Sequence, residues 1–252
     1  MCIRDRLETT DILVVSGAFF FAAFVKGITG LGFSTTALPF LVYAIGLKEA
    51  LPLLIVPSIV SNLVVMRDAG HFQQTLIQFR RLYAAAPVGI FIGLAVLMWL
   101  DPTISSAVLG LVLIIYCVVS IIQPTFRLPT HLARQLEIPV GVTTGLVNGI
   151  TGSQVIPVLP YLLSLPLTRD VFVQAVNICF TVSSIAFAIG LAWVGLLTID
   201  TTQISFIGLV AMLVGLKLGT PIRYKLSHNS FRKAVLGLLL LLGAGLVLRP
   251  LL

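Results

Sequence analysis

Two lysines stand apart from the other charges in this sequence. Lys26 and Lys217 lie inside long apolar stretches, whereas the other basic residues gather between such stretches, and no acidic residue lies deep in any of them. A charge buried in apolar surroundings needs a partner. Because the apolar stretches offer no carboxylate at that depth, an anionic ligand would complete the pair. For Lys217, which precedes Pro221 by four residues, the alternative is an ammonium that extends to a membrane surface.

The segment around Lys26 occurs twice. Residues 25–30 read VKGITG and residues 147–152 read VNGITG, with five of six positions identical. Paired glycines with a β-branched threonine are poor helix material, so each copy is predicted to break an apolar helix. The half-helix that starts there has unpaired N–H groups and a positive dipole end, which bind anions. The alternative is that these glycines only allow close packing.

Hydroxyl and amide side chains beside both copies add hydrogen-bond donors. If the two breaks enter from opposite faces, they meet near the middle of a membrane, where transporters bind their substrates. The candidate substrate-binding residues are Lys26, Gly27, Thr29, Gly30, Ser34, Asn148, Gly149, Thr151, Gly152, Ser153, Gln154 and Lys217.

Catalytic arrangements are not evident. The three histidines, His71, His131 and His228, all lie in basic loop segments, and no buried acidic pair or phosphate-binding glycine loop occurs. Serine, aspartyl and metal-dependent membrane enzymes, as well as ATP-driven pumps, need such groups. The sequence therefore predicts no enzyme, no cofactor and no metal. An intramembrane enzyme is disfavoured, and a non-transporting assembly subunit stays open as an alternative.

Composition places most of this surface in lipid. Hydrophobic residues make up 58% of the 252 positions and charged residues 10%, against about 25% charged in soluble domains. The net charge of +7 comes from short clusters between apolar segments, which favours a membrane topology rather than nucleic-acid binding. The predicted partners are a small anion and the lipid bilayer, and a homo-oligomer stays open. The apolar segments span residues 12–46, 50–66, 82–100, 104–123, 138–165, 171–194, 202–220 and 232–250.

An internal duplication relates the two halves. Besides the VKGITG copies, a Pro-aromatic-Leu step, a Gly-x-x-x-Gly pattern (Gly89 and Gly93, Gly215 and Gly219) and an AVLGL run recur, at offsets of 121 to 127 residues. Four matches in register predict a repeat of roughly 120 residues, as in many secondary transporters. The Gly-x-x-x-Gly patterns are predicted to pack helices closely.

Loop charges predict how the repeats are oriented. If each broken segment is a re-entrant hairpin of two half-length arms, ten basic residues fall on one side of the membrane and four on the other. This asymmetry makes the basic side cytoplasmic. The prediction is an all-α polytopic membrane protein of two inverted repeats, each a broken-helix hairpin followed by three transmembrane helices, with both termini outside. The expected boundaries are a non-native or disordered leader (1–11), a first repeat (12–124), a cytoplasmic linker (125–137) and a second repeat (138–252).

The glycine-rich break in each repeat, with its Pro-aromatic step, resembles the TauE/SafE family of sulfite and organosulfur anion exporters over residues 12–250. In the first copy Gly27, Gly30 and Gly32 match the family pattern, whereas Ser153 and Gln154 replace glycine in the second. The resemblance implies a secondary transporter that exports sulfite, sulfoacetate or a related anion across the bacterial inner membrane.

Overall fold

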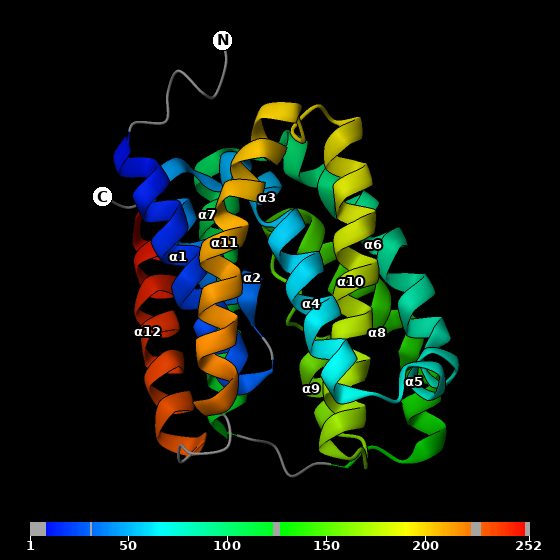
Figure 1. Cartoon of the computed structure of the whole chain (residues 1–252). Coiled ribbons are helices and arrows are strands. Elements are labelled where there is room, and N and C mark those ends of the chain that lie inside the picture. Colours follow the sequence, from blue (N-terminus) through cyan, green and yellow to red (C-terminus); the bar gives the residue numbers. More distant parts are fainter. Residues whose placement is uncertain (1–8, 31, 123–126, 223–227, 250–252) are drawn as a thin grey trace.

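The protein is an all-helical bundle in the part of the chain that the computed structural model describes, residues 9–30, 32–122, 127–222 and 228–249 (Figure 1). This confirms the all-α prediction. The helices are α1 Thr9–Thr29, α2 Phe33–Ile45, α3 Leu47–Leu53, α4 Ile55–Ala69, α5 Phe72–Gln78, α6 Arg80–Trp99, α7 Pro102–Ile122, α8 Thr130–Thr151, α9 Val158–Leu163, α10 Arg169–Trp193, α11 Ile199–Ile222 and α12 His228–Leu248.

Several of these helices can cross a membrane. Among the described residues α6, α7, α10 and α11 are long and apolar enough, which makes four spans. A fifth is obtained if α3 and α4, which meet at a bend of 43°, are one broken span. The chain is therefore a multi-pass membrane protein. The segment expected as one crossing at 50–66 is divided by this bend.

The two broken segments form hairpins, but their arms are unequal. The first arms, α1 and α8, have 21 and 22 residues, but neither is among the helices long and apolar enough to be a candidate span. The second arms, α2 and α9, have 13 and 6 residues. The prediction of two half-length arms was wrong, because α1 and α8 begin in the polar segments before the apolar runs.

Those early helix starts also move the expected boundaries. Three residues of the expected leader, 9–11, belong to α1, and residues 1–8 lie outside the described residues. Helix α8 starts at Thr130, inside the expected linker, of which residues 125–126 are outside the described part. Polar residues extend a helix beyond its apolar stretch at no solvation cost when that end reaches water, so the apolar pattern alone underestimates its length.

Helices pair across the two halves in an exchanged pattern. Helix α1 packs along α11, and α8, its counterpart in the second copy, packs along α6, the counterpart of α11. The remaining counterparts pack on each other, α4 on α10 and α7 on α12. The two predicted repeats therefore pack against each other rather than as two separate bundles.

Glycines allow the closest of these contacts. A Cβ on Gly89 or Gly93 would collide with the backbone of α8, and one on Gly215 or Gly219 would collide with the backbone of α1. The prediction that both Gly-x-x-x-Gly patterns pack helices is confirmed, since side chains there would hold the backbones apart.

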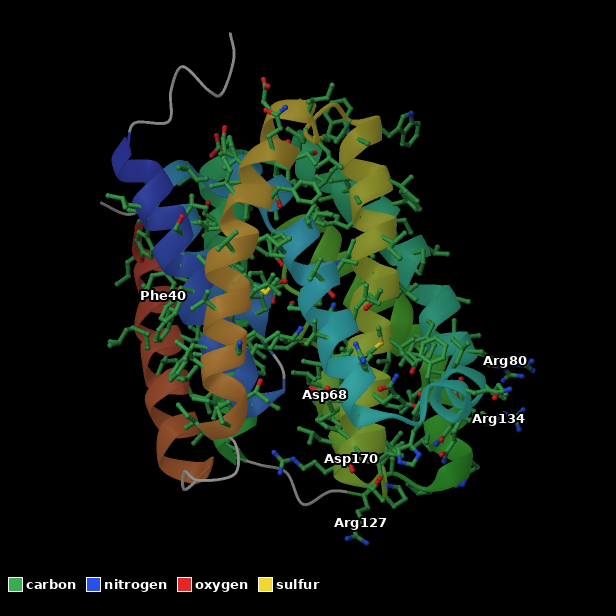
Figure 2. The ribbon with its side chains drawn as sticks, in the orientation of Figure 1. Phe40, Asp68, Arg80, Arg127, Arg134 and Asp170 are labelled. Atoms are coloured by element: carbon green, nitrogen blue, oxygen red, sulfur yellow. The ribbon has the colours of Figure 1, made fainter. Side chains whose placement is uncertain are left out.

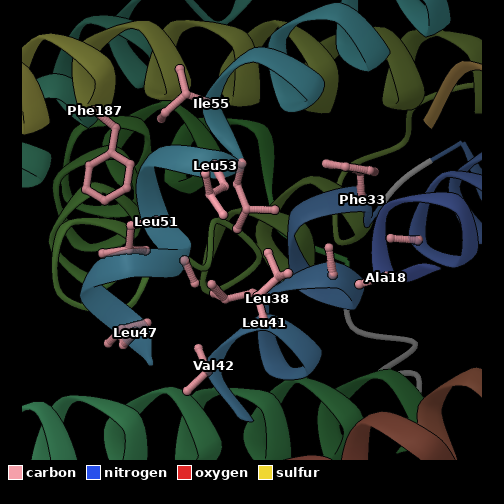
Figure 3. Packing of buried hydrophobic residues seen from close by; sticks show 14 of the residues in the cluster. Ala18, Phe33, Leu38, Leu41, Val42, Leu47, Leu51, Leu53, Ile55 and Phe187 are labelled. Atoms are coloured by element: carbon pink, nitrogen blue, oxygen red, sulfur yellow. The ribbon is translucent and has the colours of Figure 1, made fainter. Parts of the chain in front are cut away.

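The largest apolar core lies around the turn from α2 into α3. Figure 3 shows Leu38 and Leu41 of α2 facing Leu51 and Leu53 of α3, all of which are fully buried or nearly so. Phe187 of α10 closes the same cluster. This core anchors the second arm of the first hairpin against both halves of the protein.

The ends of the bundle differ in charge. In Figure 2 the labelled Arg80, Arg127 and Arg134 lie in the lower part of the bundle. The first turn of α1 and the last turn of α12 lie at the upper end, as does α3, whereas α10 starts at the lower end (Figure 1). These three arginines therefore lie at the end opposite to α3, which carries Lys48.

Candidate functional site

Lys26 lies at the centre of the site, in the last turn of α1. Its side chain is 1% exposed. The ammonium donates hydrogen bonds to Ser61 Oγ, at 3.2 Å, and to Asn62 Oδ1, both on α4. These acceptors are neutral, so they solvate the lysine without cancelling its charge.

The start of α2 faces the same place. Gly30 and Gly32 adopt left-handed conformations, with φ of 82° and 87°, which glycine reaches without steric cost. The turn they make brings Ser34 to α4, where its hydroxyl lies 2.7 Å from Ser58 Oγ. The N-cap residue of α2 is Gly32, which has no side chain to cap the helix, and the first N–H groups of a helix have no acceptor within it. The first turn of α2 therefore offers N–H donors and a positive dipole end.

The second break contributes neutral polar groups. Gln154, which follows the end of α8, donates from Nε2 to Ser184 Oγ of α10 at 3.1 Å, and its Oε1 is buried without a partner. Ser153 Oγ and both polar side-chain atoms of Asn148 are also buried and unpartnered. Unpaired buried polar atoms cost free energy, and a ligand or water that binds them recovers it.

Lys26, Ser34 and Gln154 meet at a small cavity of about 10 Å³, close to the space that one water molecule needs, whereas Asn148 and Ser153 do not line it. Its lining comprises Lys26, Gly32, Phe33, Ser34, Thr35, Asn62, Gln154 and Phe180. Lys26 is the one basic residue of that lining within the described chain, and none of the lining residues is acidic. The result is a polar cavity with one basic residue, at the break between α1 and α2.

A second, much larger cavity of about 940 Å³ lies next to it. Gly32 and Thr35 line both cavities. The large cavity extends to Leu128 and to Arg169, the first residue of α10, which begins at the lower end of the bundle (Figure 1). Its lining therefore includes a residue at the basic end of the protein as well as two residues of the small cavity.

The structure brings only some of the predicted residues together. Lys26, Ser34 and Gln154 line the small cavity and Thr29 lines the large one. The predicted breaks are shifted: Gly27 and Gly149 lie inside α1 and α8, against the backbones of α11 and α6. The prediction that a helix starts at these glycines was wrong, because each motif ends a helix and the next begins at Phe33 or Val158.

The glycines that end the two motifs cap the preceding helices. Gly30 and Gly152 have positive φ, and their N–H groups donate to the carbonyls of Lys26 and Asn148, each at 2.7 Å. This is a left-handed helix cap. Thr151 Oγ1 donates to Val147 O and accepts from Ser153 N, so its hydroxyl holds the turn.

Lys217 lies elsewhere. Its side chain is exposed on the outer surface of α11, and it lines neither cavity. This placement agrees with the alternative in which the ammonium extends to a membrane surface.

Some residues of the site were missed from the sequence. Ser58 lies three residues before Ser61 and four before Asn62, so the three side chains share one face of α4. Polar side chains at that spacing in an apolar segment are a detectable signal. Ser184 and Phe180, which lie on α10, could not be assigned, because only the packing of α10 on α4 places them here.

The fold and site define a multi-pass membrane protein with a buried basic centre. A family model described as sulfite exporter TauE/SafE matches residues 15–246 of the chain. The chain belongs to this family of membrane anion transporters. No curated protein and no solved structure gives a significant match.

Proposed function

We propose that this protein is a secondary transporter that exports a small anion, sulfite, sulfoacetate or a related organosulfur anion, across the bacterial inner membrane. The observation that carries the proposal is Lys26, a buried lysine whose described partners are neutral. It lies beside the uncapped first turn of α2 in a cavity without an acidic residue. An anion there is attracted by the ammonium and by the N–H groups together.

The charge of the two ends supports the direction. Arginines gather at the lower end, which the positive-inside rule assigns to the cytoplasm. The large cavity runs from Arg169 at that end toward Lys26. An anion from the cytoplasm then reaches the site through this cavity, and a later rearrangement of the two halves releases it on the other side.

The role of the chain as a transporter rather than an enzyme is part of the same proposal. The family consists of transporters. The described site offers an ammonium, hydroxyls and amides, which bind an anion but provide no activated nucleophile with a paired base.

The test of this proposal is Lys26→Met, measured in two ways. Methionine keeps the length of the side chain and removes the charge. Because an ammonium among neutral groups is costly to bury, the ligand-free variant should unfold at a higher temperature than the wild type. Its sulfite flux in proteoliposomes should fall at least about tenfold, the factor that corresponds to about 1.4 kcal/mol.

Lys217→Met is the matched control, since it removes an exposed lysine from α11. Its flux should equal that of the wild type. Wild-type flux in Lys26→Met, or equal losses in both variants, would reject the role of Lys26. A saturating anion, at about 100 times its Kd, should add about 2.7 kcal/mol to the stability of the wild type.

A further inference from the structure

The large cavity has mainly apolar walls and a polar end. Most of its lining residues are valine, leucine, proline or phenylalanine, such as Val119 on α7 and Leu239 on α12. Three threonines line it at the break between α1 and α2, namely Thr29, Thr35 and Thr36. The cavity therefore offers hydroxyl groups at the break and a largely apolar surface beyond it.

The walls of this cavity come from both halves of the chain. Helices α1, α2, α7 and α12 line it together with α8, α9 and α10. In Figure 1 α1 and α12 lie at the left of the bundle, and α8, α9 and α10 lie at the right. The volume of about 940 Å³ is within the range of sites that bind small organic molecules. Sulfite, which has one sulfur and three oxygen atoms, fills only a small part of such a space.

The charged residues in the described lining of the two cavities are basic. Lys26 lines the small cavity and Arg169 the large one, and neither lining has an acidic residue. Gly32 and Thr35 line both cavities, so the first turn of α2 borders the large cavity too. Its N–H groups and positive dipole end favour an anionic group there. A cationic ligand finds no counter-charge in either lining.

We infer that the large cavity is a subsite for the apolar body of an organic anion, such as an alkanesulfonate, whose charged group lies at the first turn of α2. The inference rests on the proposed function and specifies its organosulfur substrates. The N–H groups and the nearby ammonium attract the sulfonate, and the alkyl chain leaves water for the valine and leucine walls. Sulfite and sulfoacetate remain ligands, because their anionic groups bind at the same end, but an apolar body adds affinity.

The test measures how affinity depends on chain length. It uses the full chain in phosphatidylcholine nanodiscs, in which no detergent competes for the cavity. Affinities for methane-, propane- and pentanesulfonate are obtained from the shift of the thermal unfolding midpoint over a concentration series, at constant ionic strength. A buried methylene group tightens binding up to about fourfold, so pentanesulfonate should bind at least about tenfold more tightly than methanesulfonate. Equal affinities across the series would overturn the inference.

Pentanol and pentyltrimethylammonium have the same chain without an anionic group. They should bind at least about tenfold more weakly than pentanesulfonate, and Lys26→Met should weaken pentanesulfonate binding at least about fivefold. Equal binding of the three compounds would mean that the cavity accepts any apolar chain, which overturns the inference. Loss of the chain-length dependence when phosphatidylglycerol is added to the nanodiscs would assign the cavity to anionic lipid and overturn it as well.

Two neighbouring valines of α7 give a matched pair of variants. Val119 lines the large cavity, whereas Val118 is 43% exposed and lines neither cavity. Val119→Phe should fill part of the cavity and reduce the gain from methane- to pentanesulfonate at least about fivefold, with sulfite affinity unchanged. Val118→Phe should behave like the wild type.

An unchanged gain in a folded Val119→Phe protein, or the same loss in Val118→Phe, would overturn the inference. If Val119→Phe does not fold, Val140→Phe, which narrows the cavity from α8, is measured by the same criteria. Its control is Ile138→Phe, because Ile138 lies on the same helix, is exposed and lines neither cavity.

Failure of the inference differs from failure of the proposed function. Sulfite flux that depends on Lys26, together with equal affinities for the three sulfonates, rejects the apolar subsite alone. No flux and no thermal response to sulfite or to any of the sulfonates in the wild type reject both.

Discussion

The two helix breaks of this protein come from one duplicated motif and are built differently. The first turns through Gly30 and Gly32 into α2, a helix of 13 residues whose uncapped start lies beside Lys26. The second continues through Ser153 and Gln154 into α9, which has 6 residues. The first break therefore has the charge and the helix start on which the proposed anion site depends, and the second has neutral side chains. Two copies of one motif can thus differ in charge, with the basic residue in only one of them.

The strongest test of the difference between the two breaks exchanges Lys26 and Asn148, which occupy the same position in the two copies of the motif. In the double variant Lys26→Asn with Asn148→Lys, the charge moves to the break that lacks a long second helix. Sulfite affinity should stay at least about tenfold below that of the wild type, because the N–H groups of α2 no longer act together with an ammonium. Affinity is measured by thermal shift, with Lys26→Asn alone for comparison. Wild-type affinity in the double variant would mean that the breaks are equivalent.

Helix packing should, by contrast, be equivalent in the two copies. A Cβ on Gly27 would lie 2.8 Å from Leu216 O of α11, and one on Gly149 would lie closer still to Ile90 O of α6, so both collide with backbone. Gly27→Ala and Gly149→Ala should each lower the free energy of unfolding by about 1–3 kcal/mol, the usual cost of overpacking. The measurement is denaturant unfolding in detergent.

Gly17→Ala is the control for these alanines. Gly17 lies on α1 with no atom near the position of a Cβ, so this change should stabilise the helix by about 0.5–1 kcal/mol. If only one of Gly27→Ala and Gly149→Ala were destabilising, the exchanged packing of α1 on α11 and α8 on α6 would not be energetically equivalent.

The smallest effect is expected at the entrance of the large cavity. Arg169 is exposed there, and its charge attracts anions over a distance that salt screens. Arg169→Gln should lower the initial rate of sulfite transport about two- to fivefold at low ionic strength and have little effect at high salt. Lys48→Gln, on α3 at the opposite end (Figure 1), is the control. A loss that does not depend on salt would indicate a structural role for Arg169.

The sequence by itself determined the membrane character, the helical class and the position of the two breaks to within a few residues. Long apolar runs have few alternatives in lipid, because every backbone polar group must be satisfied within the segment. It also indicated Lys26, since a charge in such a run is costly and needs a reason. The prediction of two half-length arms was wrong, because α8 begins with polar residues that the apolar pattern does not include.

Tertiary structure decided which residues meet. Lys26 and Lys217 are both lysines in apolar helices, but packing buries the first against α4 and leaves the second on the outer surface. In the same way the sequence indicated Gly27 and Gly149 as ligand-binding glycines, but in the structure they lie against the backbones of α11 and α6. Burial and contact between distant segments depend on how helices pair, and the periodicity of a single segment carries no information about its partner.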